Sequence, residues 1–292
     1  MQPIDPSRLE SSAASLGDAI PIAAPFVDAL SQLHHAAQIA AEVGKSWAQP
    51  QPDDSHSNFE WRDGFLMGAL VSAPRPFRAA LRAQDLALRL VAEDGAVLAA
   101  RMLAGATAAE AVRWVRAQAA LFAGTAERQA AVPAPDLPAH PVADGAPFAL
   151  RDRDAWAALA RLLAGADAVL RAVAVNAPNA APVRLWPHHF DIATLIAPDP
   201  GRSVGIGLAV PDAIAASGYW YVSPWSAEPL AAAATDWPSL PNGRFVPRGE
   251  SLPIAVLPLD AFAQIEKPEA RIRALAEFLS ESIASSAAQL GF

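Results

Sequence analysis

Residues 85–103 read DLALRLVAEDGAVLAARML, two apolar runs on either side of the turn Glu93-Asp94-Gly95-Ala96. Leucine recurs at positions 86, 88 and 90, and this period of two places the leucines on one face of a strand. Gly95 can adopt the positive φ that a tight turn between two strands requires. The stretch therefore predicts a β-hairpin.

Helices are expected on both sides of this hairpin. An apolar stripe at helical spacing begins at Phe26 and predicts a helix that stops at Gly44. A strand is expected at 65–71. After the hairpin, Thr107-Ala-Ala-Glu110 matches a capping box, in which the threonine hydroxyl and the glutamate carboxylate each accept a hydrogen bond from a backbone N–H. The first half therefore has the order helix, strands, helix.

The second half repeats this order. A helix is expected from about Asp152, and a strand-rich region from Val183 to about Leu257. A last helix is expected from Pro268, because proline suits the first turn of a helix. The predicted fold is α+β, with two similar helix–strands–helix units packed together and mixed or antiparallel sheets. An internal duplication would produce this order, and a single α+β domain is the alternative.

Composition along the chain sets the expected boundaries. Residues 1–24 are polar and rich in Pro, Ser and Ala, and predict a loose N-terminal lead-in. Residues 133–147 carry five prolines and predict a linker. This linker would separate an N-terminal α+β unit, 25–132, from a C-terminal α+β unit, 148–292.

The composition of the 292 residues argues against several classes of function. The net charge is −8 and no cluster of basic residues occurs, so we expect no nucleic-acid partner. There is no cysteine, which excludes disulfides and thiolate chemistry. No apolar run reaches the ~18 residues of a membrane helix, and the first residues do not resemble a signal peptide. We therefore expect a cytoplasmic protein without a membrane partner. The abundance of alanine and the two lysines, Lys45 and Lys267, suggest a bacterial source.

The segment Val183–Trp225 holds the residues best suited to chemistry. If a strand follows Pro187, alternation places His189 and Asp191 on one face. A carboxylate beside an imidazole can fix its tautomer and raise its basicity, which suits general-base catalysis or metal ligation. The alternative is that one histidine caps the strand and Asp191 accepts hydrogen bonds from backbone N–H groups. Because no histidine follows His189, a metal site would need its third ligand from a downstream Asp or Glu, or from upstream His34 or His56.

Two further segments in this region have an alternating pattern. In Ser203–Val210 one strand face carries almost no side chains, which admits either a closely packed neighbour or a ligand. The segment is not a dinucleotide-binding fingerprint, because the third glycine is missing. In Tyr219–Trp225 the residues Tyr219, Tyr221, Ser223 and Trp225 share a face. Such aromatic residues with polar tips line ligand sites, but they also pack in ordinary sheets.

His56 in the first half stands where the proposed repeat would place His188 or His189, so it is a further candidate. The expected catalytic residues are His188, His189 and Asp191. The expected ligand-binding residues are His56, Tyr219, Tyr221 and Trp225.

The order of several motifs resembles that of a bacterial family of uncharacterised proteins, classed as a domain of unknown function. The matching stretches are Leu33-His34 with Gly44-Lys45, His56, and Trp186-Pro-His-His-Phe190-Asp191-Ile-Ala193, which resembles the family's Trp-x-x-Phe-Asp-(Leu/Ile)-Ala segment. Tyr219–Trp225 resembles a later Tyr-rich piece, without the Trp-Pro-Gly that precedes it in the family. The resemblance covers most of residues 30–229 and implies kinship, but it assigns no activity.

Three hypotheses of function follow. The first is a cytoplasmic small-molecule-binding protein whose pocket lies in the C-terminal unit and is lined by His189, Asp191, Tyr219 and Tyr221. The second is an enzyme that uses His188 or His189 with Asp191 as a general base or metal ligand. The third is a protein-interaction scaffold with exposed aromatic residues such as Trp225 and Trp237. The sequence identifies no cofactor, no ligand and no oligomeric state.

Overall fold

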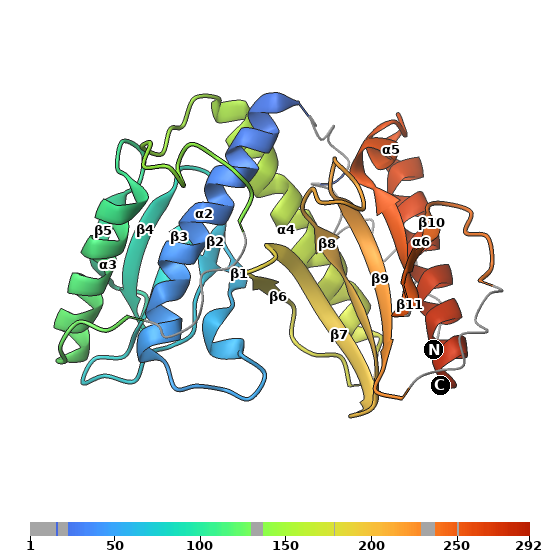
Figure 1. Cartoon of the computed structure of the whole chain (residues 1–292), viewed down its shortest axis with the longest axis horizontal. Coiled ribbons are helices and arrows are strands. Elements are labelled where there is room, and N and C mark those ends of the chain that lie inside the picture. Colours follow the sequence, from blue (N-terminus) through green and yellow to red (C-terminus); the bar gives the residue numbers. More distant parts are fainter. Residues whose placement is uncertain (1–15, 17–22, 130–136, 178, 229–236, 250) are drawn as a thin grey trace. The chain divides into compact units, whose positions relative to one another are not determined.

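The computed structural model describes residues 16, 23–129, 137–177, 179–228, 237–249 and 251–292. These residues form helices and two antiparallel sheets, so the predicted α+β class is confirmed (Figure 1). The chain divides into two compact units. The first unit comprises residues 23–160 and 184–190, and the second comprises the remaining described residues.

In the first unit, two helices pack on one face of a sheet whose strands β1 to β5 follow the order of the sequence (Figure 1). The helices are α2 (Ala24–Trp47) and α3 (Ala108–Ala123), and the strands are β1 (Glu60–Arg62), β2 (Phe65–Met67), β3 (Phe77–Arg82), β4 (Ala87–Ala92) and β5 (Val97–Met102). The predicted hairpin is confirmed as β4 and β5, with Gly95 at φ +85°. The capping box of Thr107 and Glu110 at the start of α3 is also confirmed.

The two faces of this sheet differ in chemistry. Trp61, Leu66, Leu81 and Leu88 lie opposite one another across β1 to β4, and all four are buried. The ring of Phe77, on the same face of β3, lies 6.1 Å from that of Phe122 in α3, so this face is the one covered by helices. The next row on the opposite face is Glu60, Met67, Ala80 and Arg89. The uncovered face therefore carries charged side chains.

Two predictions in this unit are wrong. Helix α2 does not stop at Gly44 but continues to Trp47. The strand expected at 65–71 ends at Met67, because the chain leaves the ladder after Gly68 and rejoins it only at the isolated bridge between Val71 and Phe77.

A short strand from a distant part of the chain, β6 (Arg184–Trp186), also belongs to the first unit. The N–H of Phe59 donates to the Leu185 carbonyl at 3.0 Å, and the N–H of Leu185 donates to the Phe59 carbonyl at 2.8 Å. This antiparallel bridge brings β6 beside β1.

The second unit has a sheet in which β10, β11, β9, β8 and β7 follow one another. These strands are β7 (Asp191–Asp199), β8 (Arg202–Ala209), β9 (Tyr219–Ser226), β10 (Arg244–Arg248) and β11 (Ser251–Pro258), followed by α5 (Leu259–Ala263) and α6 (Pro268–Leu290). The long helix α4 (Arg153–Val175) contains the boundary between the units, at Ala160. Pro268 occupies the first turn of α6, as predicted.

The segment predicted to link the two units can be compared with the structure. Of the proline-rich segment 133–147, the described residues 137–147 belong to the first unit, where Val142 is buried and His140 Nε2 lies 3.1 Å from Asp28 Oδ1. The duplication of a helix–strands–helix unit stays a prediction.

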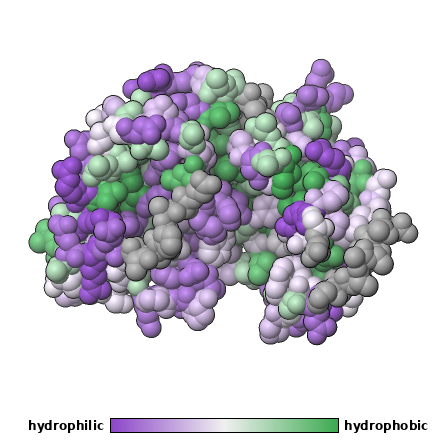
Figure 2. Space-filling model, in the orientation of Figure 1, coloured by the Kyte–Doolittle hydropathy of each residue, from purple (hydrophilic) through white to green (hydrophobic). Residues whose placement is uncertain are grey.

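The face of the molecule shown in Figure 2 is not uniformly hydrophilic or hydrophobic. Figure 2 shows hydrophobic residues interspersed among hydrophilic ones on the face in view. Within the described residues, no helix is both long enough and apolar enough to cross a membrane.

Candidate functional site

The structure brings together two of the residues predicted for the second unit, Asp191 and Tyr221. The Tyr221 hydroxyl donates to Asp191 Oδ2 at 2.7 Å. The Tyr219 hydroxyl donates to Asp212 Oδ2 at 2.8 Å, and the two tyrosine rings lie 6.4 Å apart. Burial, followed by the neighbouring carboxylates, raises the pKa of both tyrosines. Both hydroxyls therefore stay protonated and act as hydrogen-bond donors.

The bare strand face predicted around Gly207 is filled by one of these rings. A Cβ at Gly207 would lie 2.8 Å from ring atoms of Tyr221 and 2.7 Å from the Ile192 carbonyl oxygen. Glycine is therefore required here for close packing of the tyrosine, which is one of the two explanations that the sequence left open.

Replacing Tyr221 by phenylalanine should lower the free energy of unfolding by about 1–2 kcal/mol, because a buried hydrogen bond to a carboxylate is lost. Chemical denaturation measures this change. A double-mutant cycle with Asp191→Ala isolates the coupling, and additive effects of the two substitutions would contradict a direct interaction.

The aromatic residues expected at an interaction surface differ in exposure. Trp225 at the end of β9 is 51% exposed. Trp237 is partly covered, with its ring 4.5 Å from that of Phe245.

His188 and His189 do not lie on a strand. The N–H of Phe190 donates to the Trp186 carbonyl at 2.7 Å, which closes a turn over residues 187–190, and Phe190 has a φ of +56°. Strand β7 begins only at Asp191. The expectation that alternation puts His189 and Asp191 on one strand face is therefore wrong, because the turn breaks the period of two. The rings of His188 and His189 lie 4.4 Å apart.

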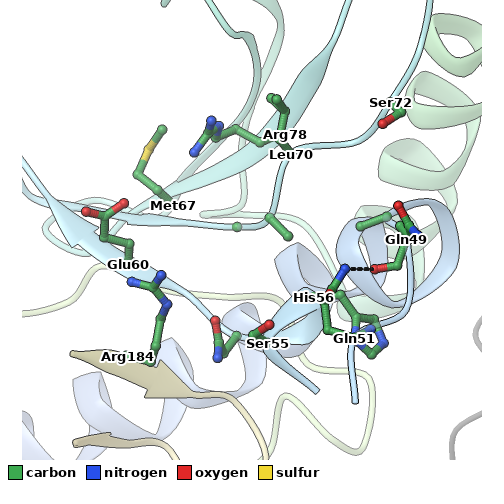
Figure 3. A pocket seen from close by; sticks show the side chains of 14 residues that line it. Gln49, Gln51, Ser55, His56, Glu60, Met67, Leu70, Ser72, Arg78 and Arg184 are labelled. Atoms are coloured by element: carbon green, nitrogen blue, oxygen red, sulfur yellow. Dashed lines mark hydrogen bonds between the residues drawn. The ribbon is translucent and has the colours of Figure 1, made fainter. Parts of the chain in front are cut away.

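A cavity in the first unit joins His56 to a set of polar side chains that the sequence did not single out. Its volume is about 340 Å³ (Figure 3). It is lined by Ala48, Gln49, Gln51, Ser55, His56, Asn58, Glu60, Met67, Gly68, Ala69, Leu70, Ser72, Arg78 and Arg184.

One wall of the cavity is the uncovered face of the sheet. The bridge between Phe59 and Leu185 places Glu60 of β1 opposite Arg184 of β6, and Glu60 pairs with Met67 of β2. Arg78 of β3 follows beyond Met67, and Figure 3 shows the four side chains in this order. The row exists because side chains on successive strands of a sheet align on one face.

The other wall is the chain that follows α2, including the short helix η2 (Ser55–Ser57). It lies close against α2, since a Cβ at Gly44 would come within 2.1 Å of the His56 carbonyl oxygen. His56 Nδ1 accepts a hydrogen bond from the Gln51 backbone N–H at 3.2 Å. The proton of the neutral imidazole is therefore on Nε2, which is left as a donor.

Asn58 is the most unusual residue of the lining. It is only 3% exposed, and among the described residues its Nδ2 has no hydrogen-bond partner. An unpaired buried amide costs about 1–3 kcal/mol, so native proteins rarely retain one without a reason.

The charged side chains of the cavity differ in whether they have a partner of opposite charge. Arg62 Nη2 lies 2.7 Å from Glu60 Oε2 at the edge of the lining. Arg78 is partly buried, and within the described part of the chain it has no ion pair and no hydrogen bond. Its guanidinium is therefore available to a ligand.

No group of three or more His, Cys, Asp or Glu residues that could hold a metal ion occurs among the described residues. Comparisons with known proteins add no relative: no family model, no curated protein and no solved structure matches the chain.

Proposed function

We propose that this protein binds a small polar molecule in the cavity of the first unit. The observation that carries the proposal is the buried, unpartnered amide of Asn58 in the cavity lining. A ligand that accepts a hydrogen bond from this amide would recover the free energy lost when the group was removed from water.

The rest of the lining suits such a ligand. A volume of about 340 Å³ lies at the small end of the range for ligand pockets, which begins near 300 Å³. Met67 and Leu70 offer apolar contacts beside the polar groups. In the second unit, by contrast, Tyr221 and Asp191 already bond to each other. We therefore place the ligand at His56 and Asn58 rather than at the tyrosines.

This proposal keeps the class of function expected from the sequence and moves the site to the first unit. A metabolite-binding role also agrees with the expected cytoplasmic location. The resemblance to a family of uncharacterised proteins assigns no activity, so the proposal depends on the cavity alone.

Replacing Asn58 by leucine, whose side chain has the same number and branching of heavy atoms, should raise the free energy of unfolding by about 1 kcal/mol and abolish binding. The apolar side chain removes the cost of the unpaired amide, and the ligand loses its partner. Denaturation in urea measures stability. Titration with 4-hydroxybenzoate, 4-hydroxybenzamide and phenyl phosphate measures binding in both proteins, followed by NMR of the backbone amides of lining residues such as Gln51 and Ser72. In the wild type the Asn58 side-chain amide is followed as well.

Asn176→Leu is the matched control, since the Asn176 amide donates to the Ala172 carbonyl at 2.8 Å. That variant should lose stability and leave the NMR titrations unchanged. The proposal fails if none of the three probes shifts the Asn58 signals. It fails equally if each probe binds the Asn58→Leu variant as tightly as the wild type.

A further inference from the structure

We infer that the ligand of this cavity carries a carboxylate or phosphate group, and that the Arg78 guanidinium binds it. The inference rests on the proposed function and names the chemical class of its ligand. It depends on the charges of the lining, whereas the proposal of a binding site depended on Asn58.

Arg78 differs from the other arginines on its face of the sheet, and from Arg75 in the loop before β3. Acidic partners hold three of them: Arg62 with Glu60, Arg75 with Asp94, and Arg82 with Asp85. Arg89 lies over the Phe65 ring, 5.0 Å from its centroid. Arg78 alone among these five points into the cavity lining with neither an acid nor a ring against it, within the part of the chain that the structure describes.

The sum of the charges favours an anion. The lining contains two guanidinium groups, Arg78 and Arg184, and one carboxylate, Glu60. Two residues from outside the lining also contribute: Arg62 pairs with that carboxylate, and the Asp53 carboxylate interacts electrostatically with Arg184. The cavity therefore has an excess of positive charge in a protein whose net charge is −8. A partly buried guanidinium is strongly attracted to an anion, because little water screens the interaction.

The neutral groups of the lining fit the same ligand. The Asn58 amide and His56 Nε2 both present N–H donors, which match the oxygens of a carboxylate or a phosphate. The planar fork of Arg78 can bind two such oxygens at once. Met67 and Leu70 add apolar surface that an inorganic ion would leave uncovered. The ligand is therefore a small organic anion.

The test compares probes that share a ring and differ in charge. In the wild type, 4-hydroxybenzoate and phenyl phosphate should each bind at least about ten-fold more tightly than the neutral 4-hydroxybenzamide, in titrations followed by NMR at the Asn58 amide. The ratio between the two anions distinguishes a carboxylate ligand from a phosphate ligand. Arg78→Gln should reduce the preference for anions to about two-fold or less and leave the affinity for the amide unchanged.

Arg89→Gln is the control, because it removes the same charge from the neighbouring strand on the same sheet face without altering the lining. This variant should retain the preference for anions. If the amide binds as tightly as both anions, and still requires Asn58, the inference is wrong and the binding site stands. A preference for anions that survives Arg78→Gln, or is lost equally in Arg89→Gln, also overturns the role of Arg78. If no probe binds, the proposed function itself fails.

Discussion

Replacing Gly44 by alanine should lower the free energy of unfolding by about 3 kcal/mol and distort the cavity. Alanine in the interior of a helix is ordinarily more stable than glycine by about 1 kcal/mol. At this position the added methyl group would lie 2.1 Å from the His56 carbonyl oxygen, a backbone atom that cannot rotate away. Either α2 or the chain around His56 must therefore move, and overpacking of this kind is destabilising.

Denaturation in urea measures the loss, and NMR of the Asn58 amide reports on the cavity. Ser46→Ala is the control, since it adds no atom and lies in the same turn of α2. An unchanged or higher stability of Gly44→Ala would show that the chain after α2 is not held against the helix as described.

Acidification should destabilise the protein through His34, by about 3 kcal/mol between pH 6.5 and pH 4. His34 is 3% exposed, and its Nε2 lies 2.9 Å from the Pro187 carbonyl oxygen. Burial lowers its pKa from 6.5 to about 4, and the nearby His35 and His189 add smaller effects in the same direction. Below pH 6.5 the His34 imidazole is protonated in the unfolded chain but stays neutral in the folded protein until the pH nears 4. The free energy of unfolding therefore falls as the pH falls from 6.5 to 4.

Urea denaturation at a series of pH values tests this expectation in the wild type and in His34→Gln. The variant should lose less stability than the wild type between pH 6.5 and pH 4. Above pH 7.5 the difference between the two proteins should be constant, because the imidazole is neutral in both states. Parallel curves through the whole range would contradict a buried, neutral His34.

Local patterns predicted the elements of the fold well. The hairpin around Gly95, the capping box at Thr107 and the start of α6 at Pro268 each depend on residues within a few positions of one another. The wrong predictions occurred where packing between distant segments overrode a local sequence signal. Gly44 looks like the end of a helix in the sequence, whereas in the structure it is the point where the chain at His56 touches α2.

The sequence placed the expected pocket in the C-terminal unit and did not predict this cavity. His56 was expected to bind a ligand, and it lies in the lining. Asn58, Glu60, Arg78 and Arg184 were missed. Alternation in the strands marks Glu60 and Arg78 as outward-facing charges, but that signal is common in half-exposed sheets. The approach of β6 to β1 has no local signature, because it depends on the bridge between Phe59 and Leu185.

The bridge between Phe59 and Leu185 also affects the order in which the parts of the first unit can fold during synthesis. The ribosome releases the sheet strands β1 to β5 long before it synthesises β6, so the wall that bears Arg184 joins last. Contacts between such distant residues form late in folding, because a long loop must first be closed. The cavity is therefore complete only after the chain has passed through α4 and returned to the first unit.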